Sequence, residues 1–220
     1  MAERVEAYVG EYASGKSEVA VNRALMLQSG GEQVTLVDLD LVEPTYTLRP
    51  LKRQLEALGL DVIAWETAET LGLGEAGAVL HPAAPAVLRR PGSVVLDVGY
   101  GVYGSDALNL IDGAWEHPRL QVIMVFNTSR PLTHSVADIV REAQSIRRVD
   151  ALLNNTHRGD ETSVELVQAG ARVVAQAARQ LNRPVLATCA VQAIAAQIGP
   201  EDACGHPVWP LRRFLPAAFW

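Results

Sequence analysis

Residues 9–17 read VGEYASGKS and place two glycines, a lysine and a serine at fixed spacing. Gly10 and Gly15 permit a backbone path that turns successive N–H groups inward, where they bind phosphate oxygens together with the N-terminus of a following helix. Lys16 then reaches the outer phosphates, and the Ser17 hydroxyl is placed to bind Mg²⁺. This spacing is that of a P-loop. We therefore predict a nucleotide-phosphate site formed by Gly10, Glu11, Tyr12, Ala13, Ser14, Gly15, Lys16, Ser17 and Glu18.

The sequence on either side of this run supports the motif. Residues 4–9 are typical of a strand, and residues 17–27 carry apolar side chains at helical spacing before a pair of glycines ends the helix. Strand, loop and helix in this order are what a phosphate-binding loop requires. A tight strand-to-helix turn would also explain the glycines, but it would not explain the lysine and serine that follow the second one.

The rest of the chain alternates apolar strands with helices. We predict further strands over 33–37, 60–65, 93–98, 120–126, 149–153 and, as the last strand, 184–188. Helices are predicted over 51–58, 133–146, 162–181 and 191–198, with short helices and a mobile loop over 66–90. Such alternation is typical of a parallel sheet covered on both faces. The predicted fold is therefore α/β, a doubly wound, mostly parallel sheet in a three-layer sandwich.

Acidic residues stand at the carboxyl ends of two predicted strands. Asp38 and Asp40 close the strand over 33–37, and Asp97 closes the strand over 93–98. In doubly wound sheets ligands bind at this edge, and Mg²⁺ prefers oxygen ligands. We assign Asp38 and Asp97 to the metal together with Ser17, and Asp40 to a water beside the outermost phosphate. The predicted catalytic residues are Lys16, Asp38 and Asp40; a helix cap or a strand-end turn is the alternative role of each acid.

With these motifs the chain resembles the MinD/ParA/Mrp-like branch of P-loop NTPases, which includes the cobyrinic acid a,c-diamide synthases and other CobQ/MinD-like nucleotide-binding domains. The matching segments are residues 10–17, 37–40, 96–99 and 153–155. More closely, the chain is similar to a group of small bacterial MinD-like ATP-binding proteins of unassigned role. That group carries an Asn-x-x-Arg-Pro segment and an Asn-x-x-x-Gly-x-Glu-Thr segment, here residues 127–131 and 155–162.

The resemblance implies which residues contact the base. Asn155 occupies the place of an asparagine that binds the adenine edge, and Asn154 is the second choice. Asn127 and Arg130 are expected near the base or in the signal to a partner. No guanine-binding Asn/Thr-Lys-x-Asp sequence follows these strands. The implied cofactors are therefore ATP and Mg²⁺, with GTP as the weaker alternative.

One position departs from the family pattern. MinD and ParA carry a second lysine early in the P-loop, which crosses to the nucleotide of the other subunit, and the matching residue here is Glu11. A carboxylate repels phosphate instead of neutralising it. We therefore do not expect the lysine-bridged dimer mechanism, although a homodimer of another kind stays open.

Composition excludes several classes of partner. The net charge of −6 argues against binding to nucleic acid, which needs a basic face. No apolar run approaches the roughly 20 residues of a membrane span, and the start of the chain shows no signal-peptide pattern. Cys189 and Cys204 lack the spacing of a metal site and are typical of free thiols in a reducing cytoplasm.

The sequence predicts one nucleotide-binding domain over residues 1–200 and an aromatic tail over 201–220 that docks on it, a partner or membrane-surface role being the alternative for the tail. Three functions are compatible with these features. The first is an ATPase switch that regulates or matures a partner protein. The second is a ligase or kinase acting on a small acidic metabolite, as in the diamide-synthase relatives. The third is a nucleotide-responsive binding module without significant hydrolysis.

Overall fold

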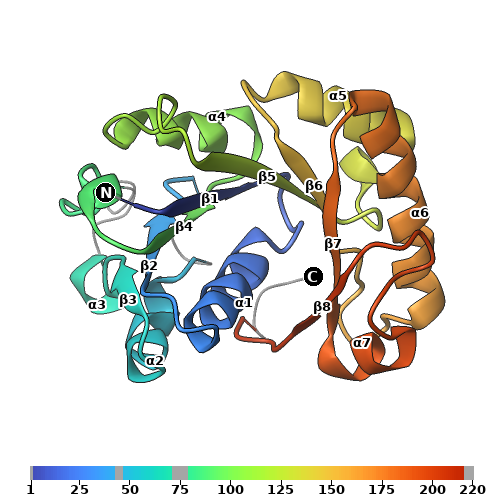
Figure 1. Cartoon of the computed structure of the whole chain (residues 1–220), viewed down its shortest axis with the longest axis horizontal. Helices are drawn as coiled ribbons and strands as arrows, with labels where there is room; N and C mark the ends of the chain where they lie inside the picture. The colour runs from blue at the N-terminus through green and yellow to red at the C-terminus, as the bar shows by residue number, and fades with distance from the viewer. Residues whose placement is uncertain (1, 43–46, 71–78, 216–220) are drawn as a thin grey trace. The chain divides into compact units, whose positions relative to one another are not determined.

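The P-loop lies between β1 (Arg4–Val9) and α1 (Lys16–Ser29), as the sequence predicts (Figure 1). The computed structural model describes residues 2–42, 47–70 and 79–215. Buried Glu6 in β1 accepts hydrogen bonds from the guanidinium of Arg23 in α1, at 2.8 and 2.9 Å, and from the Tyr8 hydroxyl at 2.9 Å. Burial alone would raise the pKa of Glu6, yet these partners hold it below its usual value. The strand before the loop and the helix after it are thus joined by a buried charge pair.

The chain divides into two compact units. The first comprises Met1–Val9 and Ala20–Gln121, and the second comprises Gly10–Val19 and Val122–Trp220. Strand order is β3-β2-β4-β1 in the first unit and β5-β6-β7-β8 in the second. The pairs within each unit are parallel, which confirms the doubly wound α/β class. The remaining strands are β2 (Val34–Leu39), β3 (Asp61–Ile63), β4 (Ser93–Val98), β5 (Leu120–Phe126), β6 (Ala151–Asn154), β7 (Val185–Val191) and β8 (Val208–Leu211).

Helices connect the strands in each unit (Figure 1). The first unit contains α2 (Lys52–Ala57), α3 (Thr67–Thr70) and α4 (Gly101–Ser105), and the second contains α5 (Val136–Ser145), α6 (Val164–Leu181) and α7 (Gln192–Ile198). Short 3₁₀ turns cover Arg49–Leu51, Val87–Arg89, Asp106–Leu110 and Pro131–Thr133. The Ser163 hydroxyl caps α6 by accepting from the N–H of Leu166, and Asn182 ends this helix in the left-handed conformation. Helix α6 packs against α5, β6 and β7.

The last predicted strand is not the last strand of the chain. Val208–Leu211 forms β8, which pairs in parallel with β7, so the expectation that 184–188 is the final strand is wrong. Pro210 lies within β8, and proline is tolerated there because an edge strand leaves one side of its backbone unpaired. In the predicted loop region over 66–90, α3 and the 3₁₀ turn at Val87–Arg89 are described, while residues 71–78 lie outside the described residues.

Gly104 in α4 lies against Gly99, the residue after β4. A Cβ on Gly104 would lie 2.1 Å from the carbonyl carbon and oxygen of Gly99. Backbone atoms cannot move aside as a flexible side chain can, so we expect Gly104→Ala to lower the free energy of unfolding by about 2 kcal/mol. Denaturant unfolding measures this loss. Gly30→Ala is the control, because a Cβ there would lie no nearer than 3.2 Å to a neighbour. Equal stability of the two variants would contradict the argument.

Candidate functional site

The P-loop adopts the backbone path that its motif requires. Gly10 and Gly15 have φ of 148° and 83°. A Cβ would lie 2.5 Å from the carbonyl oxygen of Val125 at Gly10, and 2.2 Å from Asn155 Nδ2 at Gly15. Both positions therefore require glycine. Ala13 also takes a left-handed φ, 55°, which costs a non-glycine residue about 1 kcal/mol or more. Backbone strain of this kind concentrates at ligand-binding sites.

The polar groups of the loop suit an anion. Lys16 is buried, with its Nζ 3.4 Å from the carbonyl oxygen of Glu11. The Ser14 hydroxyl is buried and makes no hydrogen bond within the described part of the chain. The first N–H groups of α1 lack partners in the helix itself, as at every helix N-terminus. A lysine, hydroxyls and helix N–H groups are the donor set that binds phosphate oxygens.

Glu11 folds back on its own loop. Its Oε1 accepts the N–H of Tyr12 at 2.8 Å. Burial raises the pKa of Glu142 in α5, and the negative charge of Glu11 adds to that rise. The position that holds a lysine in MinD and ParA thus adds negative charge that acts on an acid of α5, and the expectation of a mechanism without a bridging lysine stays a prediction.

The side-chain amides of Asn127 and Asn154 form hydrogen bonds within the protein. Asn127 Nδ2 donates to the carbonyl oxygens of Ala13 and His157, at 3.5 and 3.1 Å, while its Oδ1 accepts the N–H of Ser129 and of His157. Asn154 Nδ2 donates to the Val167 carbonyl and the Thr188 hydroxyl, each at 3.2 Å. Both amides use their donors inside the protein, so the expected contact of Asn127 with a base stays a prediction that its geometry does not favour.

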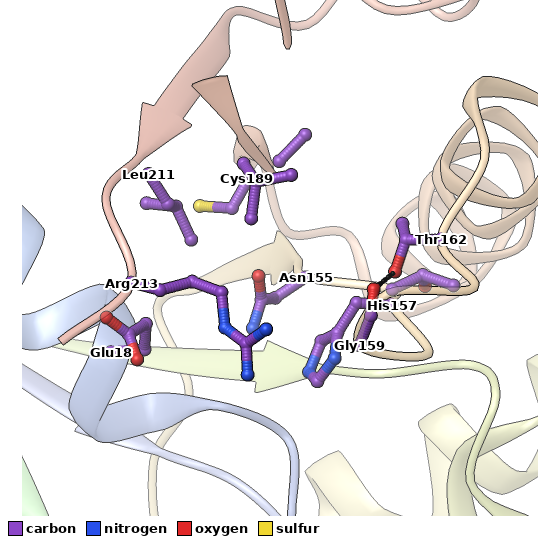
Figure 2. A pocket seen from close by; sticks show the side chains of 11 residues that line it. Glu18, Asn155, His157, Gly159, Thr162, Cys189, Leu211 and Arg213 are labelled. Carbon is purple, nitrogen blue, oxygen red and sulfur yellow. Dashed lines mark hydrogen bonds between the residues drawn. The ribbon is translucent and has the colours of Figure 1, made fainter. Parts of the chain in front are cut away.

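Asn155 is the asparagine that faces a pocket. Its Nδ2 donates to the carbonyl oxygen of Ser14 at 2.8 Å, which turns Oδ1 away from the P-loop (Figure 2). The pocket lies between the start of α1, the loop after β6, the end of β7 and the residues after β8. His157, Cys189 and Arg213 also line it. The structure therefore brings Asn155 and the P-loop of the second unit together, and the contact of Asn155 with a base stays a prediction.

Two arginine charges act on His157, which lines this pocket. Burial, with the positive charges of Arg130 and Arg213, lowers the pKa of His157 to about 4, so its imidazole is neutral at pH 7. The Arg130 Nε and Nη2 atoms are buried and have no hydrogen-bond partner among the described residues. Buried N–H groups without acceptors are costly, so Arg130 is suited to receive an acceptor from a ligand.

The His157 pKa predicts a pH dependence of stability. Between pH 6.5 and about 4 the imidazole of the unfolded chain takes up a proton, while the folded one does not. The free energy of unfolding should therefore decrease as the pH is lowered across this window. The decrease is about 1.4 kcal/mol per pH unit and at most about 3 kcal/mol in total. In chemical denaturation at pH 7, 6 and 5, the free energy of unfolding of His157→Gln should decrease less with falling pH than that of wild type. A variant of exposed His134 is the control; equal slopes for all three proteins would contradict the assignment.

The acids of the first unit gather at the ends of β2 and β4. Asp38 pairs in register with Asp97, and both are buried. The predicted strand over 33–37 would place Asp38 after its end. Strand β2 extends to Leu39, so Asp38 lies inside the strand. The Asp40 Oδ1 accepts the N–H of Val42 at 2.9 Å. Parallel strands place these carboxylates at one edge, as predicted; their roles at a metal or a water stay predictions.

Asp38 is tied to its surroundings more firmly than the sequence suggests. Its Oδ1 accepts the N–H of Asp40 at 3.0 Å, and its Oδ2 lies 3.5 Å from Arg49 Nε. Burial raises the pKa of Asp38 to about 6, although the Asp40 N–H, the Thr47 hydroxyl and the Arg49 charge oppose that rise. A carboxyl held in this way is suited to position Asp40 and Arg49, with metal binding as its further predicted role.

The histidines and cysteines show no metal spacing in the sequence, yet the structure brings one of each together with an aspartate. The side-chain ligand atoms of Asp202, Cys204 and His206 lie within 4.8 Å of one another. Asp202 Oδ1 accepts the N–H groups of Cys204 and His206, and Oδ2 accepts the Thr188 hydroxyl and faces His206 Nδ1 at 3.3 Å. These partners use the roughly four lone-pair positions of a carboxylate. These hydrogen bonds within the turn that leads into β8 explain why the three side chains lie together.

The residues after β8 are anchored on the P-loop helix. The carboxylate of Glu18, next in sequence to Ser17, accepts the N–H groups of Phe214 and Leu215. Burial raises the pKa of Glu18, although both N–H groups oppose that rise. Sequence reasoning missed this contact, because no pattern relates a helix residue to a segment almost 200 positions away. Phe219 and Trp220 of the predicted tail lie outside the described residues.

No protein-family model and no curated protein matches this chain. Solved structures do match. Cell division protein FtsY from Thermotoga maritima has a TM-score of 0.60 at 19% identity over 98% of this chain, and signal recognition particle receptor FtsY from Elizabethkingia anophelis has 0.58 at 19% over 83%. The signal recognition particle 54 kDa protein from Aeropyrum pernix K1, in complex with GDP, has 0.54 at 20% over 83%. The chain has the P-loop NTPase fold.

At these identities the likeness concerns the fold alone. The chain spans 66% of the Thermotoga FtsY chain, 57% of the Elizabethkingia FtsY chain and 40% of the Aeropyrum chain. The predicted doubly wound α/β fold is shared with these proteins, while membership of the P-loop NTPase superfamily and of its MinD/CobQ group remains an expectation. Among the described residues, the helices are too short or too polar to cross a membrane.

Proposed function

We propose that this chain binds Mg-ATP through its P-loop and hydrolyses it as a switch that regulates or matures a partner protein in the cytoplasm. The observation that carries the proposal is the loop itself. Gly10, Ala13 and Gly15 take positive φ, and buried Lys16 lies at the start of α1. A strained loop with this donor set is explained by an anionic ligand, because a plain strand-to-helix turn needs neither the strain nor the lysine.

Asn155 favours ATP over GTP in this proposal. Its Nδ2 is engaged with Ser14, so the group it offers to the pocket is the acceptor Oδ1. The adenine edge carries a 6-amino donor, whereas guanine carries a carbonyl acceptor at that position. An acceptor facing guanine would leave two polar groups unpaired. The GDP bound by the Aeropyrum protein makes GTP the competing nucleotide to test.

Competition between the two nucleotides tests the base assignment. A fluorescent ATP analogue bound to the protein should be displaced by ATP at a concentration about tenfold or more below that of GTP, because an unpaired buried polar group costs about 1–3 kcal/mol. Equal displacement by GTP would contradict the choice of ATP. Failure of the analogue to bind would contradict the nucleotide site itself.

For the bound state we propose the roles predicted from the sequence. Mg-ATP supplies the phosphoryl group to be transferred and the cation that neutralises it. Lys16 and the P-loop N–H groups hold the phosphates. Ser17, Asp97 and Asp38 would hold the cation, and Asp40 would orient the attacking water.

A ligase or kinase acting on a small acidic metabolite is the second candidate. It is favoured by Arg130, whose buried Nε and Nη2 atoms lack acceptors in the described residues and suit a metabolite carboxylate. This candidate predicts that phosphate release rises strongly with one member of a panel of small carboxylic acids. A panel without effect, together with stimulation by a protein fraction, would favour the switch.

A further inference from the structure

The segment after β8 spans the pocket and is held at two points. On one side Glu18 of the P-loop helix accepts the N–H groups of Phe214 and Leu215. On the other, Arg213 Nη1 lies 3.1 Å from Asp160 Oδ1, in the loop after β6. Figure 2 shows the guanidinium of Arg213 between Glu18 and His157, beside Asn155. The backbone of this segment is therefore fixed to the P-loop helix, while its arginine reaches over the pocket.

The two attachments differ in strength. Glu18 is buried, and a buried carboxylate that accepts two N–H groups forms a strong, charge-assisted anchor. Asp160 is 99% exposed, so its ion pair with Arg213 is screened by water. Yet only a third of the Arg213 side chain is exposed. The guanidinium therefore lies over the pocket with little holding it to Asp160, and it is able to turn toward a ligand at small cost.

We propose that Arg213 covers the face of the bound base and sets how long the nucleotide stays on the protein. This inference rests on the proposed function and assigns a residue that no motif in the sequence marks. A planar guanidinium stacks on the face of a purine, and the attraction strengthens where water is excluded. Asn155 would then contact the edge of the base while Arg213 covers its face.

The neutral imidazole of His157 supports this arrangement. Arg213 and Arg130 already place two positive charges around it, and a third would repel both. Leu211 and Cys189 supply an apolar wall to the same pocket, which suits the flat surface of a base more than a phosphate. Because Glu18 is the last residue of the predicted phosphate site, the anchor of this cover lies at that site.

Dissociation of a fluorescent ATP analogue, followed by stopped flow after excess ATP is added, tests the proposal on the full chain. Arg213→Ala should release the analogue about tenfold faster than wild type, which corresponds to about 1.4 kcal/mol. Arg213→Lys keeps the charge but lacks the planar group, and it should lose most of the same effect. Arg212→Ala is the matched control, because its guanidinium lies 5.0 Å from the centre of the Phe214 ring and does not line the pocket.

Inorganic tripolyphosphate separates a contact to the base from a general attraction of phosphate. It should displace the analogue from the P-loop with the same intrinsic affinity in wild type and in Arg213→Ala. A parallel loss of tripolyphosphate affinity would overturn the proposal, since Arg213 would then act on phosphates. Unchanged release from Arg213→Ala, with tight binding to wild type, would overturn this inference alone. Failure of wild type to bind any nucleotide would overturn the proposed function as well.

Discussion

Lys16→Ala is expected to abolish nucleotide binding while the protein still folds. Lys16 is buried at the N-terminus of α1, where the helix dipole disfavours a positive charge, so we expect the unliganded protein to keep its fold without the ammonium. A bound triphosphate, in contrast, needs the lysine to neutralise its outer oxygens. At an ATP concentration about 100 times the Kd, wild type should gain about 2.7 kcal/mol in free energy of unfolding. The variant should gain nothing.

Denaturant unfolding with and without Mg-ATP measures this difference. Lys52→Ala is the matched control, because Lys52 is the other lysine of the chain and begins α2. The control should be stabilised by ATP as wild type is. If ATP stabilises Lys16→Ala and wild type equally, nucleotide binds elsewhere or the P-loop is not the site.

Asp40→Ala is expected to keep ATP binding and to lose turnover by about 100-fold or more. The proposed task of Asp40 is to orient the attacking water, which matters in the transition state and little in the bound ground state. Asp40→Asn keeps the size of the side chain and should lose turnover in the same way. Phosphate release, measured beside ATP affinity, separates the two effects.

Asp112→Ala is the control for the acid substitutions, since Asp112 is exposed and pairs with Arg89 at the surface. It should leave turnover unchanged. If Asp40→Ala kept the turnover of wild type, this result would contradict the proposed role of Asp40 in orienting the attacking water. Negligible turnover in wild type itself, even with a partner present, would identify the chain as a binding module.

The P-loop and the strands that flank it were predictable because local chemistry dictates them. At Gly10 and Gly15 the positive φ and the close approach of other atoms leave room for no residue but glycine. The apolar runs over 93–98 and 120–126 form β4 and β5 with the predicted bounds. Strand β8 was missed for the opposite reason. It is short, contains Pro210 and has no alternation, and its pairing with β7 depends on a turn organised by Asp202.

The sequence could not tell which amides face a ligand. Asn127, Asn154 and Asn155 all follow or end strands, yet only long-range hydrogen bonds show how each amide is used. The anchor of the last described residues on Glu18 is equally long-range. Spacing along the chain predicts the phosphate loop, whereas the pocket beside it is set by tertiary contacts.

Calorimetric titration of Mg-ATP and Mg-GTP into the purified protein would show whether the P-loop holds a nucleotide and which one it prefers. We expect one ATP bound per chain, weaker binding of GTP, and no binding heat with Lys16→Ala. Absence of binding for both nucleotides at several temperatures, in a protein shown to be folded, would contradict the proposed function.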